Sequence, residues 1–292
     1  MAKIADANVE LHAHILSEKI ALNDIVDAMH IVGLDVVALS SYNSCYYPIV
    51  KKQVRKFYPE SIIDDAGVKL PNGKYLLNAQ EHSTKEGFHL LSIGYSSKDE
   101  NPEMEIRMFI DECLEKKALV FFDHPFVDTI DTFTAGHISD EKEGKLRDYC
   151  IEYSGKIGLE WNTYNIHWVR QLLKYGLNMI GHKTRYHNVN ERVEDLSKKL
   201  SSDGCNVPLL AATDLHARKA RHLLSMGTSR LVVDLDGVFA SDILASMKKN
   251  IFANDYENIK NTVPLSHLFS TYLMPISYEI LGLARKVNKI FC

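Results

Sequence analysis

Side chains that can bind metal ions recur at the ends of short apolar segments in this chain of 292 residues. The first of these segments begins at Val9 and closes with His12 and His14. Because residues i and i+2 of a strand point the same way, these two histidines should project to one side. The same spacing joins Asp214 and His216, near the other end of the chain. Between the two pairs, further apolar segments end in or lead into other ligand types: Glu81, His89 and His124.

These side chains share one kind of chemistry. Neutral imidazole nitrogens and carboxylate oxygens are a ligand set that suits zinc, iron or manganese. A carboxylate that closes an apolar strand, as Glu81 does, is costly to bury unless a cation pairs with it. The sequence therefore predicts one metal site that is assembled from the ends of several strands.

Each of these residues also has a simpler interpretation. His12 and His14 could be ordinary strand histidines. His124 could simply end a strand, because Pro125 follows it. His89 would also suit an exposed strand position. The recurrence of ligand types at so many strand ends favours the metal site over these alternatives.

Short apolar segments alternate with longer segments of helical spacing along the chain. We predict strands near residues 7–12, 34–40, 75–81, 88–95, 118–124, 157–161, 178–182, 208–214 and 226–234. We predict helices near residues 22–32, 48–57, 103–117, 140–153, 165–176, 190–202, 216–223, 239–249 and 265–288. This alternation predicts an α/β fold, and the number of strands suits a (β/α) barrel, whose active sites lie at the carboxyl ends of the strands.

The composition is that of an ordinary soluble globular protein, with 46% hydrophobic and 25% charged residues. A net charge of −4 argues against a general nucleic-acid binder. One local basic cluster is present, and we interpret it as a solvated helix face: Lys51, Lys52, Arg55 and Lys56. The five cysteines lack CxxC spacing and indicate reduced thiols. We find neither a signal-peptide pattern nor an apolar segment long enough to cross a bilayer, so we expect a cytoplasmic protein with no membrane partner.

Seven segments of the chain follow the order of a known family's motifs. They are His12-Ala-His14, a run from Gly33 to Leu39, Glu81, His89-Leu-Leu, His124-Pro125, a strand with an inner glutamate at 157–160, and Thr213-Asp214-Leu215-His216. In this order these segments resemble the polymerase and histidinol phosphatase (PHP) superfamily. The resemblance spans residues 9 to about 235.

The resemblance implies a fold, an activity and a set of ligands. The fold would be a distorted (β/α)7 barrel over residues 1–235, followed by a helical extension over 236–292 that packs on the barrel. The activity would be metal-dependent hydrolysis of phosphoesters. One metal ion would be held by His12, His14, Glu81 and Asp214. Glu81 would bridge to a second ion, held also by His89 and His124.

The chain departs from this family at the third metal position. Ile20 and Tyr42 stand where three-metal members carry histidines. Isoleucine cannot ligate and tyrosine would have to lose a proton, so only His216 of that set remains. We therefore expect two divalent ions (zinc, manganese or iron) and no stable third one. His216 would then serve to protonate a leaving group or to hold a phosphate oxygen.

Substrate groups are expected at the rim of the barrel, where arginine and lysine could bind phosphate. The candidates are Lys183, Arg185 and Arg218. Glu160 is a candidate for substrate contact, with a supporting role or a place at the edge of the core as the alternatives. Our first hypothesis is a phosphatase or phosphodiesterase for a small phosphorylated metabolite or nucleotide, with Glu81 and His216 as its catalytic residues.

Three alternatives stay open at this point. A PHP module could bind metal without hydrolysis, because the third site is incomplete. A nuclease for single-stranded nucleic acid would use the basic cluster near Lys51 together with nearby tyrosines such as Tyr46. The C-terminal helices could pair two subunits into a homo-oligomer instead of covering the barrel.

Overall fold

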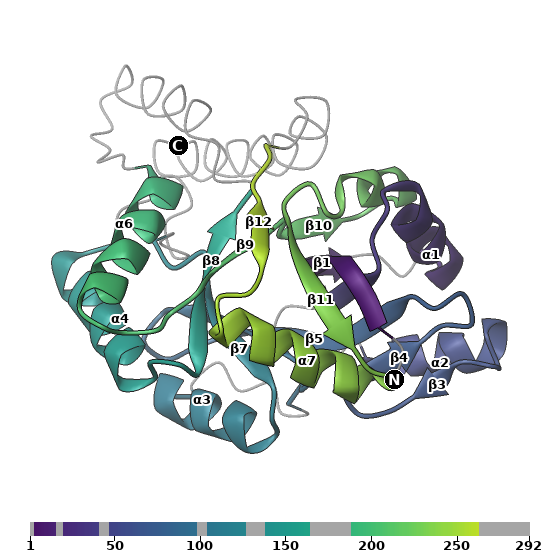
Figure 1. The fold of residues 1–292 in the computed structure, drawn as a ribbon, viewed down its shortest axis with the longest axis horizontal. Helices are drawn as coiled ribbons and strands as arrows, with labels where there is room; N and C mark the ends of the chain where they lie inside the picture. The colour runs from purple at the N-terminus through teal and green to yellow at the C-terminus, as the bar shows by residue number, and fades with distance from the viewer. Residues whose placement is uncertain are drawn as a thin grey trace, which may run out of the picture.

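Strands and helices alternate through most of the described chain (Figure 1). The structure is a computed structural model and describes residues 3–15, 20–40, 47–97, 104–126, 138–163 and 188–262. Its strands are β1 (Lys3–Ile15), β2 (Val36–Ser40), β3 (Ile62–Ile63), β4 (Gly67–Lys69), β5 (Tyr75–Ser83), β6 (His89–Ile93), β7 (Leu119–Asp123), β8 (Ile157–Asn162), β9 (Leu209–Ala212), β10 (Leu215–Ala217), β11 (Arg230–Asp236) and β12 (Glu257–Ile259). Its helices are α1 (Leu22–Ile31), α2 (Tyr47–Phe57), α3 (Ile106–Glu115), α4 (Asp140–Glu152), α6 (Val189–Ser202), α7 (Ala240–Phe252) and the short 3-10 helix η1 (Ala220–Ser225).

The principal strands form a curved sheet that nearly closes into a barrel. They follow the order β12-β11-β1-β2-β5-β6-β7-β8-β9, with β10 beside β1 and the β3–β4 hairpin beside β5. The strands β1, β2 and β5 pair in parallel, as do β7, β8 and β9, while β6 runs antiparallel between these two groups. The carboxyl ends of the parallel strands therefore lie at one end of the barrel.

Side chains close the seam between the two ends of this sheet. Ala211 N donates to Asn258 Oδ1 at 2.7 Å, and Asn258 Nδ2 donates to Leu209 O at 2.7 Å. The hydroxyl of Tyr256 donates to the same carbonyl at 2.9 Å. Because a side-chain amide offers the same donor and acceptor as a peptide group, Asn258 stands in for a ladder of backbone bonds along β9.

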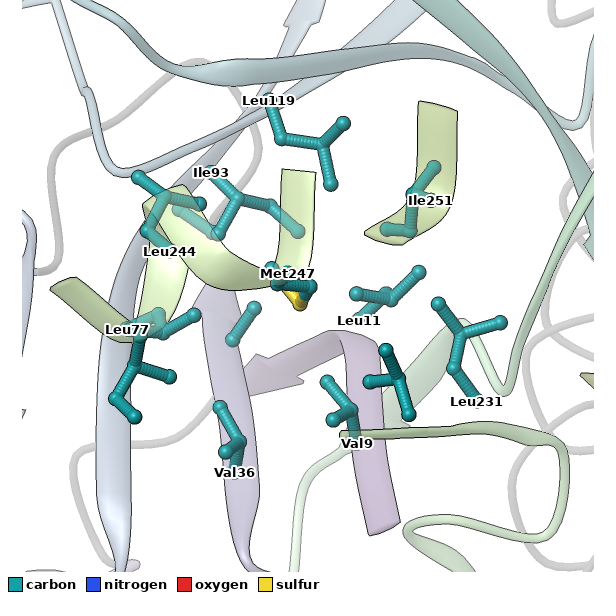
Figure 2. Packing of buried hydrophobic residues seen from close by; sticks show 14 of the residues in the cluster. Val9, Leu11, Val36, Leu77, Ile93, Leu119, Leu231, Leu244, Met247 and Ile251 are labelled. Atoms are coloured by element: carbon teal, nitrogen blue, oxygen red, sulfur yellow. The ribbon is translucent and has the colours of Figure 1, made fainter. Parts of the chain in front are cut away.

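The barrel interior is apolar at the end where the parallel strands begin, and α7 fills it. Alternate strand residues face this interior, and Figure 2 shows the cluster with Val9, Leu11, Val36, Leu77, Ile93, Leu119, Leu231, Leu244, Met247 and Ile251. Gly94, with φ of 89°, gives α7 the room it needs, because a Cβ there would lie 2.0 Å from Leu244 Cδ2. The helix thus plugs one end of the barrel and leaves the other end for polar residues.

Two further cores lie outside the barrel. Helices α3, α4 and α6 cover β6, β7 and β8 on one side, and α1, α2 and η1 cover β1, β2 and β5 on the other (Figure 1). Asn188 starts α6 by accepting a hydrogen bond from Glu191 N, as a good N-cap does. No helix in the described part of the chain is long and apolar enough to span a membrane.

The structure corrects part of the predicted order of elements. The helix predicted near 216–223 is wrong, because β10 and η1 occupy this segment. The sequence did not predict β12. The strand predicted near 178–182 and the helices predicted near 165–176 and 265–288 lie outside the described residues. The division at residue 235 stays a prediction, although α7 and β12, which both follow it, pack within the barrel core and pair with its sheet.

Candidate metal centre

A β-bulge in β1 turns His12 and His14 into the barrel. Val9 and Leu11 face the interior core, and a strict alternation would place both histidines on the opposite face. Between Glu10 and Ala13 the register with β2 shifts by one residue. Beyond that shift Ala13 packs in the outer core, so its neighbours on either side face inward.

The inward histidines meet two carboxylates from distant strands. His12 Nε2 lies 2.7 Å from His14 Nε2, and His14 Nε2 lies 2.9 Å from Glu81 Oε2. Asp214 Oδ1 lies 3.8 Å from His12 Nε2 and 3.7 Å from His14 Nε2. Two imidazole nitrogens that face each other at this distance cannot both keep a lone pair without a cation between or beside them. These four residues form the first ligand group.

Glu81 joins this group to a second one. Its Oε1 contacts His89 Nδ1 and lies 3.7 Å from His124 Nε2, whereas its Oε2 faces His14. The carboxylate is 3% exposed and lies between the two sets of histidines. One carboxylate with an oxygen toward each group has the arrangement of a bridging ligand.

Strained backbone after two strands brings the last two side chains into the site. His124 has φ of 30° and Asp214 has φ of 53°, in the left-handed region that non-glycine residues rarely adopt. At β7 this turn lets His124 reach the site directly after Asp123, although neighbouring strand residues normally point apart. Strained backbone of this kind is typical of functional sites and persists only where the surroundings enforce it.

The pKa shifts of His14, Glu81 and Asp214 suit metal binding. Burial, followed by the charge of His12, lowers the pKa of His14 to about 4, so its ring is neutral at neutral pH and its lone pair is available. Burial raises the pKa of Glu81, but hydrogen bonds from His124, His14 and His89 together hold it well below its usual value. The pKa of Asp214 is also lowered, because His216 and His12 outweigh its burial. Both carboxylates are therefore ionised.

Glu160 and Asn162 link the candidate ligands through hydrogen bonds. Glu160 Oε1 lies 2.9 Å from His12 Nδ1, and Oε2 accepts hydrogen bonds from His124 N at 3.0 Å and from Asn162 Nδ2 at 3.1 Å. Asn162 Nδ2 also donates to Asp214 Oδ2 at 2.8 Å. A carboxylate behind a ligating histidine fixes its orientation and leaves Nε2 for the metal. This geometry favours a supporting role for Glu160 over the predicted substrate contact.

Glu10 holds the backbone around the first ligand group. Its Oε1 accepts from His12 N at 2.9 Å and from Thr213 N at 3.1 Å, and its Oε2 accepts from Gly227 N at 2.7 Å. It is fully buried. One side chain thus ties the bulge of β1 to the residue before Asp214.

The remaining predicted residues have more varied positions. His216 lies on β10 opposite His14, with its Nε2 3.0 Å from Asp214 Oδ1. Arg218 is exposed, at the start of the segment that leads to η1. Ile20 is buried in the outer apolar core and does not face the ligands. Tyr42, Lys183 and Arg185 lie outside the described residues.

Three residues of the site were missed by the sequence analysis. Asp123 lies within ligand distance of Glu81, His89 and His124. It stands two residues after Phe121 in an alternating strand, which was a usable signal. Asn162 follows Glu160 by the same interval. Glu10 had no such signal, because its three partners come from backbone that only the fold brings near.

Comparison with solved structures identifies the fold. The lesion-specific endonuclease PfuEndoQ of Pyrococcus furiosus is 16% identical, with a TM-score of 0.52 over 86% of this chain and 57% of that one. A two-domain protein of Bacteroides vulgatus, described as containing a predicted PHP-like metal-dependent phosphoesterase, is 13% identical, with a TM-score of 0.52 over 89% of this chain and 65% of that one. The fold is of the PHP type. This confirms the predicted α/β barrel.

The likeness is one of structure, and it is partial. The chain spans less than two thirds of the length of either of these proteins. No protein-family model matches the chain, and no curated protein sequence matches it.

We expect Glu10→Gln to lower the free energy of unfolding by about 1–3 kcal/mol, because an amide nitrogen cannot accept and at least one buried N–H loses its partner. Urea unfolding followed by circular dichroism measures the change. Glu257→Gln, at an exposed carboxylate of β12, is the control and should leave the midpoint in place. Equal midpoints for both variants would show that Glu10 does not hold the strands together.

Proposed function

We propose that this protein is a metal-dependent phosphoesterase of the PHP type with two divalent ions. The observation that carries the proposal is the position of Glu81, whose two oxygens face two separate groups of histidines. His12, His14, Glu81 and Asp214 would hold the first ion, and Glu81, His89 and His124 the second. Buried imidazole and carboxylate ligands of this kind fit zinc, manganese or iron.

The charge balance of the site supports this proposal. In the described part of the chain five carboxylates are buried: Glu10, Glu81, Asp123, Glu160 and Asp214. No lysine or arginine among the described residues is buried with them. Burial raises the pKa of Glu10 to about 7 and that of Glu160 to about 8. Without cations the nearby acids raise the pKa values of His12 and His124 well above their usual value against burial, and protonated imidazoles cannot ligate. Divalent ions resolve the conflict, because they neutralise the carboxylates and leave the histidines neutral.

Each residue then has a part in hydrolysis. When bound, such a pair of ions lowers the pKa of water and stabilises the charge that develops on a phosphoryl group. Glu81 keeps the two ligand groups in fixed relation. Asp214 raises the pKa of His216, whose side chain is 40% exposed, so His216 would hold a proton and donate it to the leaving oxygen. Arg218, exposed beside His216, would bind a non-reacting phosphate oxygen.

For the substrate we favour a small phosphorylated metabolite or nucleotide. The support is the net charge of −4 and the position of the exposed Arg218 two residues after His216. Lys183 and Arg185 are proposed to complete this phosphate-binding rim. A panel of phosphorylated metabolites and nucleotides, assayed for phosphate release with Mn²⁺, Zn²⁺ or Fe²⁺, tests the substrate class.

A nuclease is the second candidate, and one observation favours it. Helix α2 carries four cations and no acidic residue, and Phe57 at its end is 47% exposed. Among the described residues none of these cations forms an ion pair, so the helix could bind a phosphate backbone. Cleavage of single-stranded oligonucleotides without release of phosphate from mononucleotides would favour this function over the first.

His12→Ala and Asp214→Ala should each remove bound metal and hydrolytic activity together, because both residues are placed in the first ligand group. Metal content by mass spectrometry and turnover on the best substrate of the panel provide the measurements. His30→Ala, at an exposed histidine of α1, should retain both. Variants at 12 and 214 that keep full metal content and turnover would refute the proposed centre.

Arg218→Ala should raise KM for a phosphorylated substrate by about 10- to 100-fold, because loss of a charged hydrogen bond costs about 1.5–3 kcal/mol. Metal content should not change. Arg107→Ala removes an arginine of α3 that pairs with Glu152 on the surface, and it should leave KM unchanged. A fall in metal content without a change in KM would instead make Arg218 a structural residue.

We expect two tightly bound ions at neutral pH. Ile20 is packed in the outer core, so it offers no ligand where three-metal members carry a histidine, and the third set of ligands is incomplete. His216→Ala should therefore spare the metals and lower kcat. Anomalous scattering from crystals grown with the metal counts the ions, and three fully occupied positions would contradict this expectation.

A further inference from the structure

We propose that Asp123 is a fourth protein ligand of the second metal ion, beside Glu81, His89 and His124. The inference rests on the proposed two-metal function and extends it. Asp123 ends β7, where it follows Leu119 and Phe121 on the inward face of the strand. Nothing in the order of the motifs assigns a role to this position.

The position of Asp123 is that of a ligand. It pairs directly with His89 across β6 and β7, so their side chains leave the sheet side by side on one face. Its Oδ2 lies 3.1 Å from His124 Nε2. One ligand atom each from Glu81, His89, Asp123 and His124 lies within 4.8 Å of the others. A single cation can therefore be reached by all four.

Among the described residues, only histidines and other carboxyl groups lie next to the polar atoms of this carboxylate. Its side chain is 0% exposed, and neither oxygen accepts a well-directed hydrogen bond from any described residue. No lysine or arginine in the described part of the chain pairs with it. His12 Nδ1 lies 3.4 Å away but is closer to Glu160, at 2.9 Å. A buried carboxylate in this state is strongly unfavourable unless a cation binds it.

His124 cannot satisfy Asp123 by itself. Its Nε2 faces both Asp123 Oδ2 at 3.1 Å and Glu81 Oε1 at 3.7 Å, and one N–H cannot serve both oxygens well. A metal ion held by His124 would attract both carboxylates at once. With Asp123 the second site has two nitrogen and two carboxylate ligands. That set suits an ion of higher coordination number, such as Mn²⁺, which keeps further positions for water.

The first test asks whether the side chain at 123 touches the ion. Asp123→Cys is loaded with Co²⁺, and we expect a thiolate-to-cobalt charge-transfer absorption in the near ultraviolet that the Co²⁺-loaded wild type lacks. A residue that only orients His124 would give no such band. Absence of the band in a folded variant that binds two Co²⁺ ions would overturn the proposal.

The second test measures affinity and covers the case in which Asp123→Cys does not fold. Loss of a group that only supports a ligand weakens metal binding by about 10- to 100-fold. Asp123→Asn should raise the dissociation constant of the second Mn²⁺ ion by more than this. Asp35→Asn is the matched control, because Asp35 accepts from Asn8 N at the opposite end of the barrel. It should bind both ions as the wild type does. An unchanged second affinity in Asp123→Asn would overturn the proposal.

The two proposals fail in different ways. If the wild type binds no divalent metal, the two-ion function is wrong and the role of Asp123 falls with it. If the wild type binds two ions and His89→Ala loses one, but the variants at 123 neither show the band nor lose affinity, only the fourth ligand is wrong.

Discussion

The constraint on which the rest of the structure depends is the burial of four carboxyl groups at one end of the barrel interior, without a buried lysine or arginine among the described residues. They belong to Glu81, Asp123, Glu160 and Asp214. Such a cluster is unstable unless positive charge reaches it. Histidines supply part of that charge when they are protonated, but His14 stays neutral because burial, followed by the charge of His12, lowers its pKa to about 4. The proposed pair of divalent cations would supply the positive charge that this end of the barrel lacks.

Local irregularities of the backbone place the ligands in this charged end. A regular β1 would point either Leu11 or His12 away from the interior, and the bulge between Glu10 and Ala13 allows both to face it. The positive φ of His124 has the same effect after Asp123. Glu10 and Glu160 then fix these irregular segments with hydrogen bonds to the backbone N–H groups of His12 and His124. The positive φ of His124, the bulge in β1 and the hydrogen bonds of the two buried glutamates together bring the candidate ligands to one point.

The opposite end of the barrel is filled by apolar side chains. Here α7 inserts Leu244 and Met247 among the inward residues of the strands and excludes water without polar groups (Figure 2). The seam beside it is closed by Asn258 with side-chain hydrogen bonds to β9. A sealed, apolar end gives the barrel its stability, which allows the other end to store unfavourable charge and backbone strain for binding.

The sequence by itself determined the class of fold, the order of the ligand-bearing strands and the pairing of His12 with His14, because the period of a strand and the order of motifs are local properties. It did not determine which face of β1 these histidines occupy, since a one-residue bulge reverses that choice. It left open whether Glu160 contacts substrate, supports a ligand or lies at the edge of the core, and the tertiary structure places its Oε1 2.9 Å from His12 Nδ1. It passed over Asp123 because His124 follows, and two neighbours can share a site only when φ departs from the strand. Contacts made across the fold decided what local periodicity could not.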